Sequence, residues 1–179
     1  MPTTSAESHR LRGLAITVFN SRPDIATAAV LSRLDDALGL VERYAPRRWR
    51  RLNRDLSGIV VQRFPCRAAY FPDSQACLIE LTFLAHPEIT AAQVGASIIH
   101  ESMHARIHRA GVHRAEELSA REERLCRQAE LEFGRAVPDG HAVVVRALES
   151  LALSDEGVAP VIDWAEAARR VAEADQRGQ

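Results

Sequence analysis

Two histidines and a glutamate in the segment His-Glu-Ser-Met-His, namely His100, Glu101 and His104, have the spacing of a metal centre. In an α-helix, residues four positions apart share one face and stand about 6 Å apart along the axis. Both imidazoles can therefore direct a ring nitrogen toward one ion. Glu101 lies one position round the helix, where its carboxylate reaches a water on the ion without binding the ion. The pattern predicts a Zn²⁺ site with Glu101 as general base.

A catalytic zinc ion also needs a third protein ligand and one position open to water. His108 continues the row of histidines, but it stands about 12 Å from His100 along the axis, too far for one tetrahedral ion. We therefore expect His108 beside the site or exposed to solvent. Carboxylates on the next predicted helix are better candidates. Ser119 and Glu122 have capping-box spacing, which would employ Glu122 at the helix start and leave Glu123 free to bind the ion. We predict Glu123 as the third ligand and Glu122 as its main rival. The weaker alternatives are Glu116, Glu117 and Glu130.

The complete pattern is HExxH, then 18 residues, then Glu123. It resembles the gluzincin zinc peptidases, whose third ligand is a glutamate on the following helix at about this distance. The stretch Arg121–Cys126 is also similar to a group of small bacterial HExxH proteins and, more loosely, to the ImmA/IrrE-type peptidases, which cleave a repressor protein. The resemblance covers roughly residues 77–133, about a third of the chain. It implies a zincin-like fold and zinc-dependent hydrolysis of a peptide bond.

The resemblance also implies supporting groups around the zinc ion. The strand before the active helix, here Leu78–Phe83, would line the substrate groove and pair with an extended peptide at an exposed edge. An ordinary core strand is an equally good interpretation. Cys126 would pack beneath the site as a small apolar group, and it is a weaker ligand candidate than Glu123, which lies on a similar helix face. A peptidase needs an oxyanion stabiliser. The candidates are Tyr70, His113 and His141.

The elements that must position these residues follow from periodicity and from turn signals. Helices are expected from Ser21–Asp24 to Pro46, from a Thr90–Gln93 capping box to Gly111, and over 119–135, 141–153 and 160–174. Strands are expected at 58–63, 68–71 and 76–83. This order predicts an α+β fold in which a small sheet precedes the active-site helix and the ligand helix.

An arginine-rich segment, Arg47–Arg54, offers an alternative function. Such a cluster can bind the phosphates of nucleic acid, but it is more typical of a solvated helix face with Trp49 and Leu52 turned inward. The net charge of −1 also argues against a nucleic-acid or membrane-surface binder. We therefore expect neither nucleic acid nor membrane as a partner.

Lysine is absent, and all 23 basic residues are arginine. The chain therefore has no residue for a Schiff base, a Walker A phosphate contact or a lysine general base. Three widely spaced cysteines, Cys66, Cys77 and Cys126, favour reduced thiols over a disulfide framework. The N-terminal residues do not have the pattern of a signal peptide, and no stretch approaches membrane-spanning length. These features predict a cytoplasmic protein.

The 179 residues suit one zincin-like domain, with residues 1–20 flexible in part and 141–179 forming a C-terminal helical extension. The expected function is that of a zinc metallopeptidase, with zinc held by His100, His104 and Glu123 and with a peptide or protein as substrate. One alternative keeps the zinc without catalysis, as a regulatory or partner-binding module. The second has no metal and binds nucleic acid through the arginine-rich segment.

Overall fold

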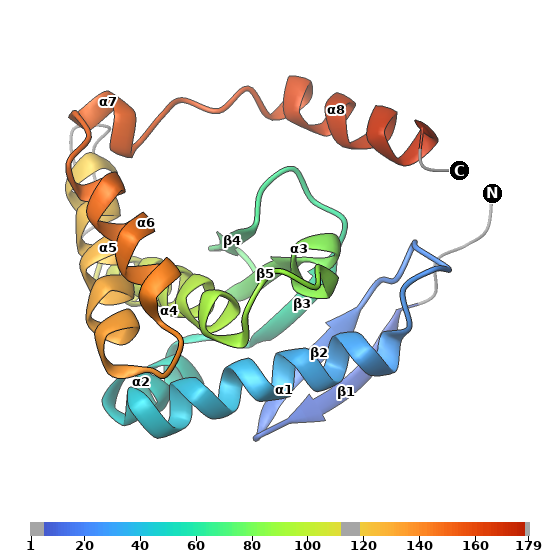
Figure 1. The fold of residues 1–179 in the computed structure, drawn as a ribbon, viewed down its shortest axis with the longest axis horizontal. Coiled ribbons are helices and arrows are strands. Elements are labelled where there is room, and N and C mark those ends of the chain that lie inside the picture. The colour runs from blue at the N-terminus through green and yellow to red at the C-terminus, as the bar shows by residue number, and fades with distance from the viewer. Residues whose placement is uncertain (1–5, 112–118, 178–179) are drawn as a thin grey trace.

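A computed structural model describes residues 6–111 and 119–177, which form one sheet and the helices around it (Figure 1). In chain order the elements are β1 (Glu7–Leu11), β2 (Leu14–Val18), α1 (Thr27–Tyr44), α2 (Pro46–Asp55), β3 (Gly58–Gln62), β4 (Ala68–Phe71), β5 (Ala76–Glu80), α3 (Leu81–Ala85), α4 (Ala91–Arg109), α5 (Ser119–Ala136), α6 (His141–Leu151), α7 (Asp155–Val158) and α8 (Trp164–Arg177). This mixture confirms the predicted α+β class.

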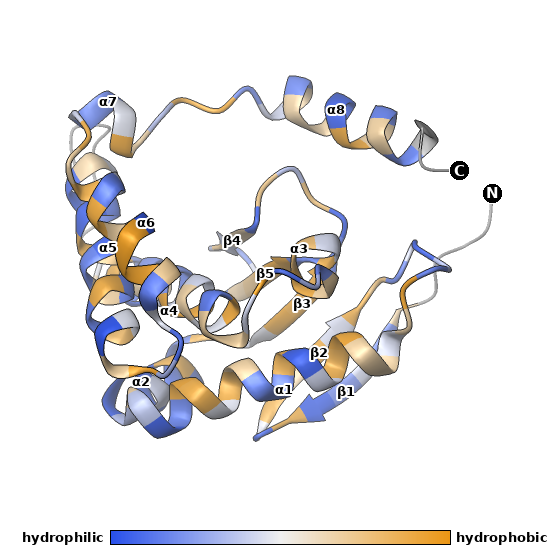
Figure 2. Cartoon of the chain, in the orientation of Figure 1, coloured by the Kyte–Doolittle hydropathy of each residue, from blue (hydrophilic) through white to orange (hydrophobic). Residues whose placement is uncertain are grey.

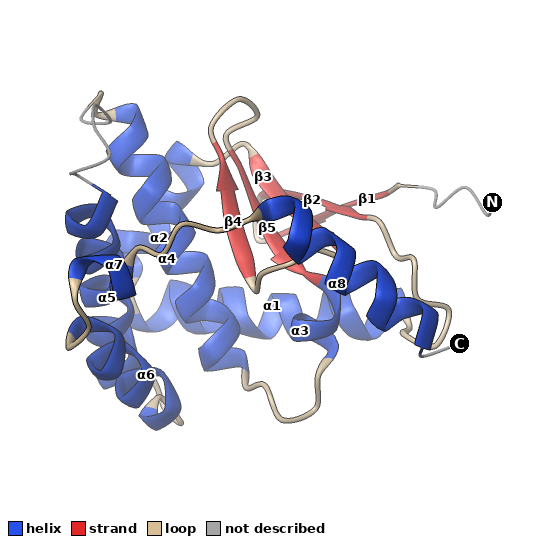
Figure 3. Ribbon diagram, turned by 90° about the horizontal axis from the view of Figure 1, so that it is seen from above, coloured by secondary structure: helices blue, strands red, loops and turns tan. Residues whose placement is uncertain are grey.

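The sheet is mixed, with strand order β1-β2-β3-β5-β4. The two central pairs, β2–β3 and β3–β5, are parallel, whereas β1 and β4 pair antiparallel at the two edges. Helices α4, α5 and α6 gather beside the end of the sheet where β4 lies (Figure 3). The sheet therefore brings its β4 edge next to the helix that carries the HExxH segment.

The hairpin of β1 and β2 occupies residues that we expected to be partly flexible. Residues 7–18 form two strands, joined by a tight turn in which Arg12 and Gly13 both have positive φ, 47° and 89°. Positive φ at both turn positions gives the twist that a two-residue hairpin requires. The side chains of β1 are mostly exposed, so the strand lacks an alternating apolar pattern. That is why the sequence did not indicate it. Residues 1–5 lie outside the described part of the chain.

Helix α1 begins later than its sequence signals suggested. The predicted start near Ser21–Asp24 is wrong, because the side chain of Asn20 organises a loop there. Its amide donates to the backbone oxygen of Ile25 at 2.7 Å and accepts from the backbone nitrogen of Arg22 at 2.9 Å. The helix then starts at Thr27 and continues to Tyr44, just before Pro46.

The main core lies between the sheet and the helices α1 and α4. Apolar side chains of β2, β3 and β5 pack against Leu34 and Leu38 of α1 and against Ile98 of α4. Each of these three residues is buried, and burial of such a side chain stabilises the fold by about 1.5–3 kcal/mol. Orange, hydrophobic residues run along β3 and also occur on α1 and α6 (Figure 2). Helix α4 is therefore held firmly on the sheet.

The predicted strand 76–83 is divided into a strand and a short helix. Glu80 ends β5, and its carboxylate accepts a hydrogen bond from the backbone nitrogen of Phe83 at 2.6 Å, which caps α3. A side-chain cap of this kind satisfies a free N–H group at a helix start and so favours helix over strand. The apolar run alone carried no sign of this switch.

The remaining helices agree in type with the sequence analysis. Thr90 and Gln93 form the predicted capping box at the start of α4. Helix α5 already includes Ser119, the residue that we expected as its cap. The predicted helix 160–174 begins only at Trp164, where Asp163 accepts a hydrogen bond from the backbone nitrogen of Glu166 at 2.9 Å. The short helix α7 was not predicted.

In α2, Leu52 is buried and Trp49 packs against the core, as expected for a solvated helix face. Part of the arginine-rich segment is already paired within the protein. Arg54 binds Asp55 at 2.7 Å, and Arg48 forms an ion pair with Glu132 of α5.

Candidate metal centre

Helix α4 carries the HExxH residues and lies beside the β4 edge of the sheet. His100 and Glu101 are buried, and His104, one turn later, is partly exposed. Ile98 and Ile99, which precede them, are completely buried in two different core clusters. Packing on both sides of the helix thus fixes the direction in which the two imidazoles point.

The two imidazoles and the carboxylate of Glu123 converge on one point. The Nε2 atoms of His100 and His104 are 3.2 Å apart. One oxygen of Glu123 lies 3.2 Å from His100 Nε2, and the other lies 3.1 Å from His104 Nε2. Glu123 thus contacts both imidazoles. The alternative ligand, Glu122, is buried in the first turn of α5. Glu116 and Glu117 lie outside the described residues.

These separations suit a tetrahedral zinc ion. Ligand nitrogen and oxygen atoms lie about 2.0–2.2 Å from zinc, so two of them stand about 3.3 Å apart at tetrahedral angles. The two imidazole nitrogens, 3.2 Å apart, match this separation, and each of them lies 3.1–3.2 Å from a different oxygen of the Glu123 carboxylate. Two imidazoles and one carboxylate also form a ligand set typical of catalytic zinc. The residues present therefore fit the ion that the sequence resemblance implies.

A carboxylate behind His100 fixes the orientation of its ring. Nδ1 of His100 lies 2.8 Å from Oε1 of Glu130, which is 1% exposed. Arg127 and Arg146 bind the same carboxylate at 2.9 and 3.0 Å. A carboxylate at Nδ1 keeps the proton there and leaves the lone pair of Nε2 for a metal. Sequence analysis considered Glu130 only as a weak ligand candidate. Its spacing of seven residues from Glu123, two helical turns, was the signal for a shared face.

Cys126 is the other potential ligand in this cluster. His100, His104 and Cys126 each have a ligand atom within 4.8 Å of the others. Burial, and then the negative charges of Glu123 and Glu101, raise the pKa of its thiol far above the usual range. Without a metal, Cys126 is thus a neutral, fully buried thiol that packs behind the cluster.

Opposite charges stabilise the cluster when no metal is present. Burial alone would lower the pKa of His100, but hydrogen bonds to Glu123 and Glu130 outweigh burial and raise it to about 9. Burial alone would raise the pKa of Glu123, yet hydrogen bonds from His100 and His104 lower it well below the usual range. A metal ion bound at Nε2 of His100 would replace the proton that lies between this atom and Glu123. Metal binding would therefore release a proton.

Glu101 differs from the other carboxylates because it has no internal partner. It is 7% exposed, and within the described part of the chain no group forms a hydrogen bond or ion pair with its carboxylate. Burial raises its pKa, an effect that the positive charges of His100 and His104 partly oppose. A buried carboxylate without a partner is costly unless water or a ligand reaches it. Glu101 is therefore available for an incoming molecule.

A cavity of about 650 Å³ gives access to this cluster. Helices α4 and α5, strand β4 and the segment between α7 and α8 contribute to its walls. The lining residues include His100, Glu101, His104, Glu123, Arg67, Tyr70, Arg127, Arg146 and Trp164. The volume suits a few residues of an extended peptide, within the usual range for small-molecule sites.

The strand beside this cavity is β4. Of the two interpretations of Leu78–Phe83, the exposed edge is wrong and the core strand is confirmed for residues 78–80, which belong to β5. That strand is buried and pairs with β3 on one side and with β4 on the other. In the described sheet β4 is the edge strand on the side of the cavity, and Ala68, Ala69 and Tyr70 line the cavity. The sequence did not reveal strand order, because order depends on pairing between distant segments.

Of the three oxyanion candidates, Tyr70 lies at the cavity. Its hydroxyl is 3.3 Å from Nδ1 of His108, and burial raises the pKa of the phenol, which keeps it protonated as a hydrogen-bond donor. His141 begins α6 with its side chain exposed, away from the lining residues. His113 lies outside the described residues.

Comparisons of the chain with models of protein families, with curated proteins and with solved structures found no match. Within residues 6–111 and 119–177, none of the helices has both the length and the apolar composition that crossing a bilayer requires.

Proposed function

We propose that this protein is a zinc-dependent peptidase with a zincin-like arrangement of sheet, active-site helix and ligand helix. One observation carries the proposal: His100, His104 and Glu123 converge to within 3.2 Å of one another beside the unpartnered, buried Glu101. Zinc would be held by these two histidines and Glu123. The substrate would be a peptide or protein segment that enters the cavity along β4.

In this mechanism zinc, when bound, supplies a Lewis acid that lowers the pKa of water and polarises the peptide carbonyl. Glu101 accepts a proton from the attacking water and then donates it to the nitrogen of the leaving amine. Glu101 is available for both roles because its carboxylate has no hydrogen bond or ion pair to any described residue. Tyr70, a protonated donor in the cavity wall, is the candidate to stabilise negative charge on the carbonyl oxygen.

Strand β4 gives the substrate a place to bind. An edge strand has free backbone N–H and C=O groups, and an extended peptide can pair with them as an added strand. This mode of binding depends on the backbone more than on side chains. It would orient a peptide next to Glu101 while leaving sequence preference to other residues of the cavity.

Cys126 supports a second candidate function, a zinc-binding module without catalysis. Its thiol lies near both histidines, and as a fourth ligand it would close the site to water. A site with four protein ligands is typical of a structural zinc ion. The two candidates therefore differ in whether Cys126 binds the metal.

The test compares the wild type with Glu101→Gln and Cys126→Ser, each loaded with one equivalent of zinc. Cleavage of a mixed peptide library is followed by mass spectrometry of new termini. We expect the wild type to cleave, Glu101→Gln to lose about 10²–10⁴-fold in rate with zinc content unchanged, and Cys126→Ser to retain both properties.

Each result has a clear consequence. Stoichiometric zinc without cleavage in the wild type, together with loss of zinc in Cys126→Ser, would favour the non-catalytic module. Cleavage that survives in Glu101→Gln would contradict the role of this residue. A wild-type protein that does not retain zinc would contradict the metal centre itself.

A further inference from the structure

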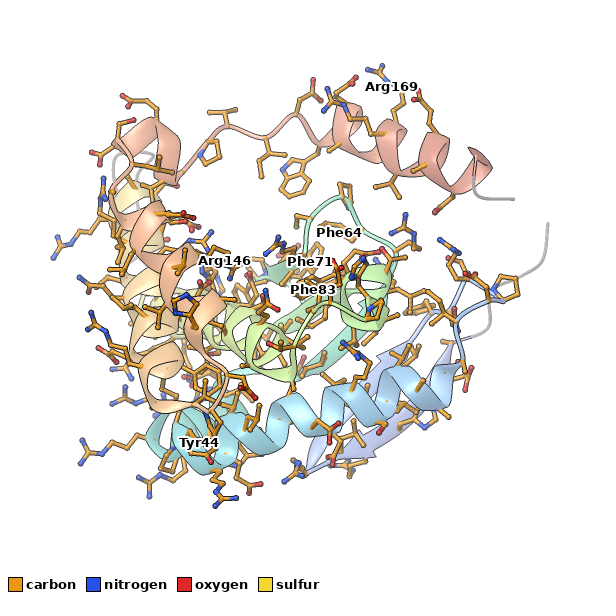
Figure 4. All side chains as sticks on the ribbon, in the orientation of Figure 1. Tyr44, Phe64, Phe71, Phe83, Arg146 and Arg169 are labelled. Carbon is orange, nitrogen blue, oxygen red and sulfur yellow. The ribbon has the colours of Figure 1, made fainter. Side chains whose placement is uncertain are left out.

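Three arginines line the cavity together with the candidate metal centre. Arg67 directly precedes β4, Arg127 lies on α5 and Arg146 lies on α6. Figure 4 shows Arg146 on the inner side of α6, toward the centre of the molecule. Elements far apart in sequence thus bring three guanidinium groups to one cavity.

The three arginines differ in what they already bind. Arg127 and Arg146 share the carboxylate of Glu130, which positions His100. The guanidinium group of Arg67 has no hydrogen bond or ion pair to any described residue, and it lies over the ring of Phe83 at 5.4 Å. Arg67 is therefore the arginine that is available to a ligand.

The positive charges also influence one another. Burial lowers the pKa of Arg67, and the charges of Arg146 and Arg127 lower it further. Arg127 and Arg146 share the negative charge of Glu130, whereas no described carboxylate pairs with Arg67. A ligand carboxylate would supply the missing partner of Arg67. Guanidinium is also the side chain best suited to bind a carboxylate, through two parallel N–H donors.

We propose that Arg67, with Arg146 near it, forms a subsite that binds one carboxylate of the peptide substrate. The inference rests on the proposed peptidase function and adds a specificity to it. The carboxylate belongs either to an aspartate or glutamate side chain or to the C-terminus of the peptide. Arg67 acts in binding, whereas Glu101 acts on the scissile bond.

The test uses small zinc-binding probes, so no natural substrate has to be known. A hydroxamate group attaches each probe to the zinc ion, and an alkyl chain of increasing length ends in either a carboxylate or a carboxamide. Isothermal titration of the zinc-loaded protein gives Kd for each probe. At the chain length that reaches Arg67, we expect the carboxylate probe to bind about 10-fold more tightly than its carboxamide.

Variants assign this preference to a residue. Arg67→Gln should abolish the difference between the two probes, and Arg67→Lys should retain part of it. Arg50→Gln, which removes an exposed arginine on α2, should leave the difference unchanged. All four proteins should bind the carboxamide probes equally, because Arg67 has no contact with the zinc ligands.

The outcomes separate this proposal from the proposed function. Equal binding of both probes at every chain length, or a preference that survives in Arg67→Gln, would overturn the Arg67 subsite but not the zinc centre. Failure of every hydroxamate to bind would overturn the zinc centre, and the subsite with it. Two peptide hydroxamates identify the source of the carboxylate. One has a glutamate and an amidated C-terminus, and the other has a glutamine and a free C-terminus. Tighter binding of the first would assign the subsite to an acidic side chain, and tighter binding of the second would assign it to the C-terminus.

Discussion

The two nitrogens of the His100 ring have different partners, and that difference prepares the residue for a metal. Nδ1 faces the buried carboxylate of Glu130, while Nε2 faces His104 and Glu123. Two arginines hold Glu130 in place. In the proposed metal centre Glu130 would therefore be a positioning residue, which acts on the metal through the histidine.

The first residue-scale prediction concerns Glu130. Glu130→Gln removes the charge that orients His100, so we expect zinc affinity to fall by about 10–100-fold, measured by competition with a chelator. Glu132→Gln is the matched control, because Glu132 is on the same helix with a side chain that is 68% exposed. Equal zinc affinity in both variants would contradict the positioning role.

The second residue-scale prediction concerns Cys77 of β5. Its thiol is fully buried, and burial raises the pKa of this thiol well above the usual value of 9.0. The folded state keeps the thiol protonated, whereas the unfolded chain loses the proton above about pH 9. The stability from this group is therefore complete below pH 9 and is lost as pH rises toward the folded pKa. Between pH 8 and pH 10 the free energy of unfolding should fall by about 1.4 kcal/mol more in the wild type than in Cys77→Ala, measured by urea denaturation. An equal fall in the free energy of unfolding of both proteins would contradict this prediction.

At the scale of elements, close packing of α4, α5 and α6 brings together the residues of the candidate metal centre and the groups that contact them. Helix α4 supplies the histidines, α5 supplies Glu123 and Glu130, and α6 supplies Arg146. The connection from α5 to α6 is tight: a Cβ atom at Gly140 would lie 2.0 Å from the backbone oxygen of Gly134. Only glycine allows this approach.

This packing gives a prediction for two glycines. Gly140→Ala must push backbone apart and should destabilise the protein by about 1–3 kcal/mol, with weaker zinc binding as α6 shifts. Gly39→Ala is the matched control within α1, where the added methyl meets only the flexible end of Arg12. Because alanine favours helix, Gly39→Ala should be neutral or stabilising by up to about 1 kcal/mol. Thermal and urea unfolding measure the stability of both variants. A Gly140→Ala protein as stable as the wild type would rule out the close approach of Gly140 to Gly134.

At the scale of the whole molecule, the segment between α7 and α8 contributes to the wall of the cavity. It runs without regular structure from α7 to α8 (Figures 1 and 2). Few contacts hold α8 to the rest of the molecule. Asp175 pairs with Arg63 at 2.8 Å, and Trp164 packs against Phe64 with ring centroids 5.7 Å apart. Val161, in the segment between α7 and α8, is completely exposed.

We expect the segment between α7 and α8 to be cut early by a protease. Thermolysin prefers apolar residues, so its early cleavage should include Val161 or Ile162, where the backbone is exposed and outside regular structure. The remaining chain should keep its far-UV circular dichroism and its zinc, because the metal cluster lies on α4 and α5. Mass spectrometry of a time course identifies the cuts. Early cleavage inside β3 or β5, with residues 159–163 intact, would contradict this view of the molecule.

The sequence by itself determined the candidate site residues on α4 and the helices that carry the candidate site. The spacing of His100, Glu101 and His104 and the capping box at Thr90 are local patterns, and local patterns depend on helix geometry alone. For the same reason the predicted bounds of α4 and α5 lie close to the observed ones. The spacing also indicated Glu123, which lies against both histidines in the structure.

Only the tertiary structure decided which distant groups meet. The strand order that puts β4 at the edge, the contact of Glu130 with His100 and the position of Arg67 and Arg146 in one cavity depend on packing between separate elements. The β1–β2 hairpin was missed because pairing with a neighbour, not an apolar pattern, makes β1 a strand. Pairing and packing energies arise between segments far apart in the chain, so no local pattern records them.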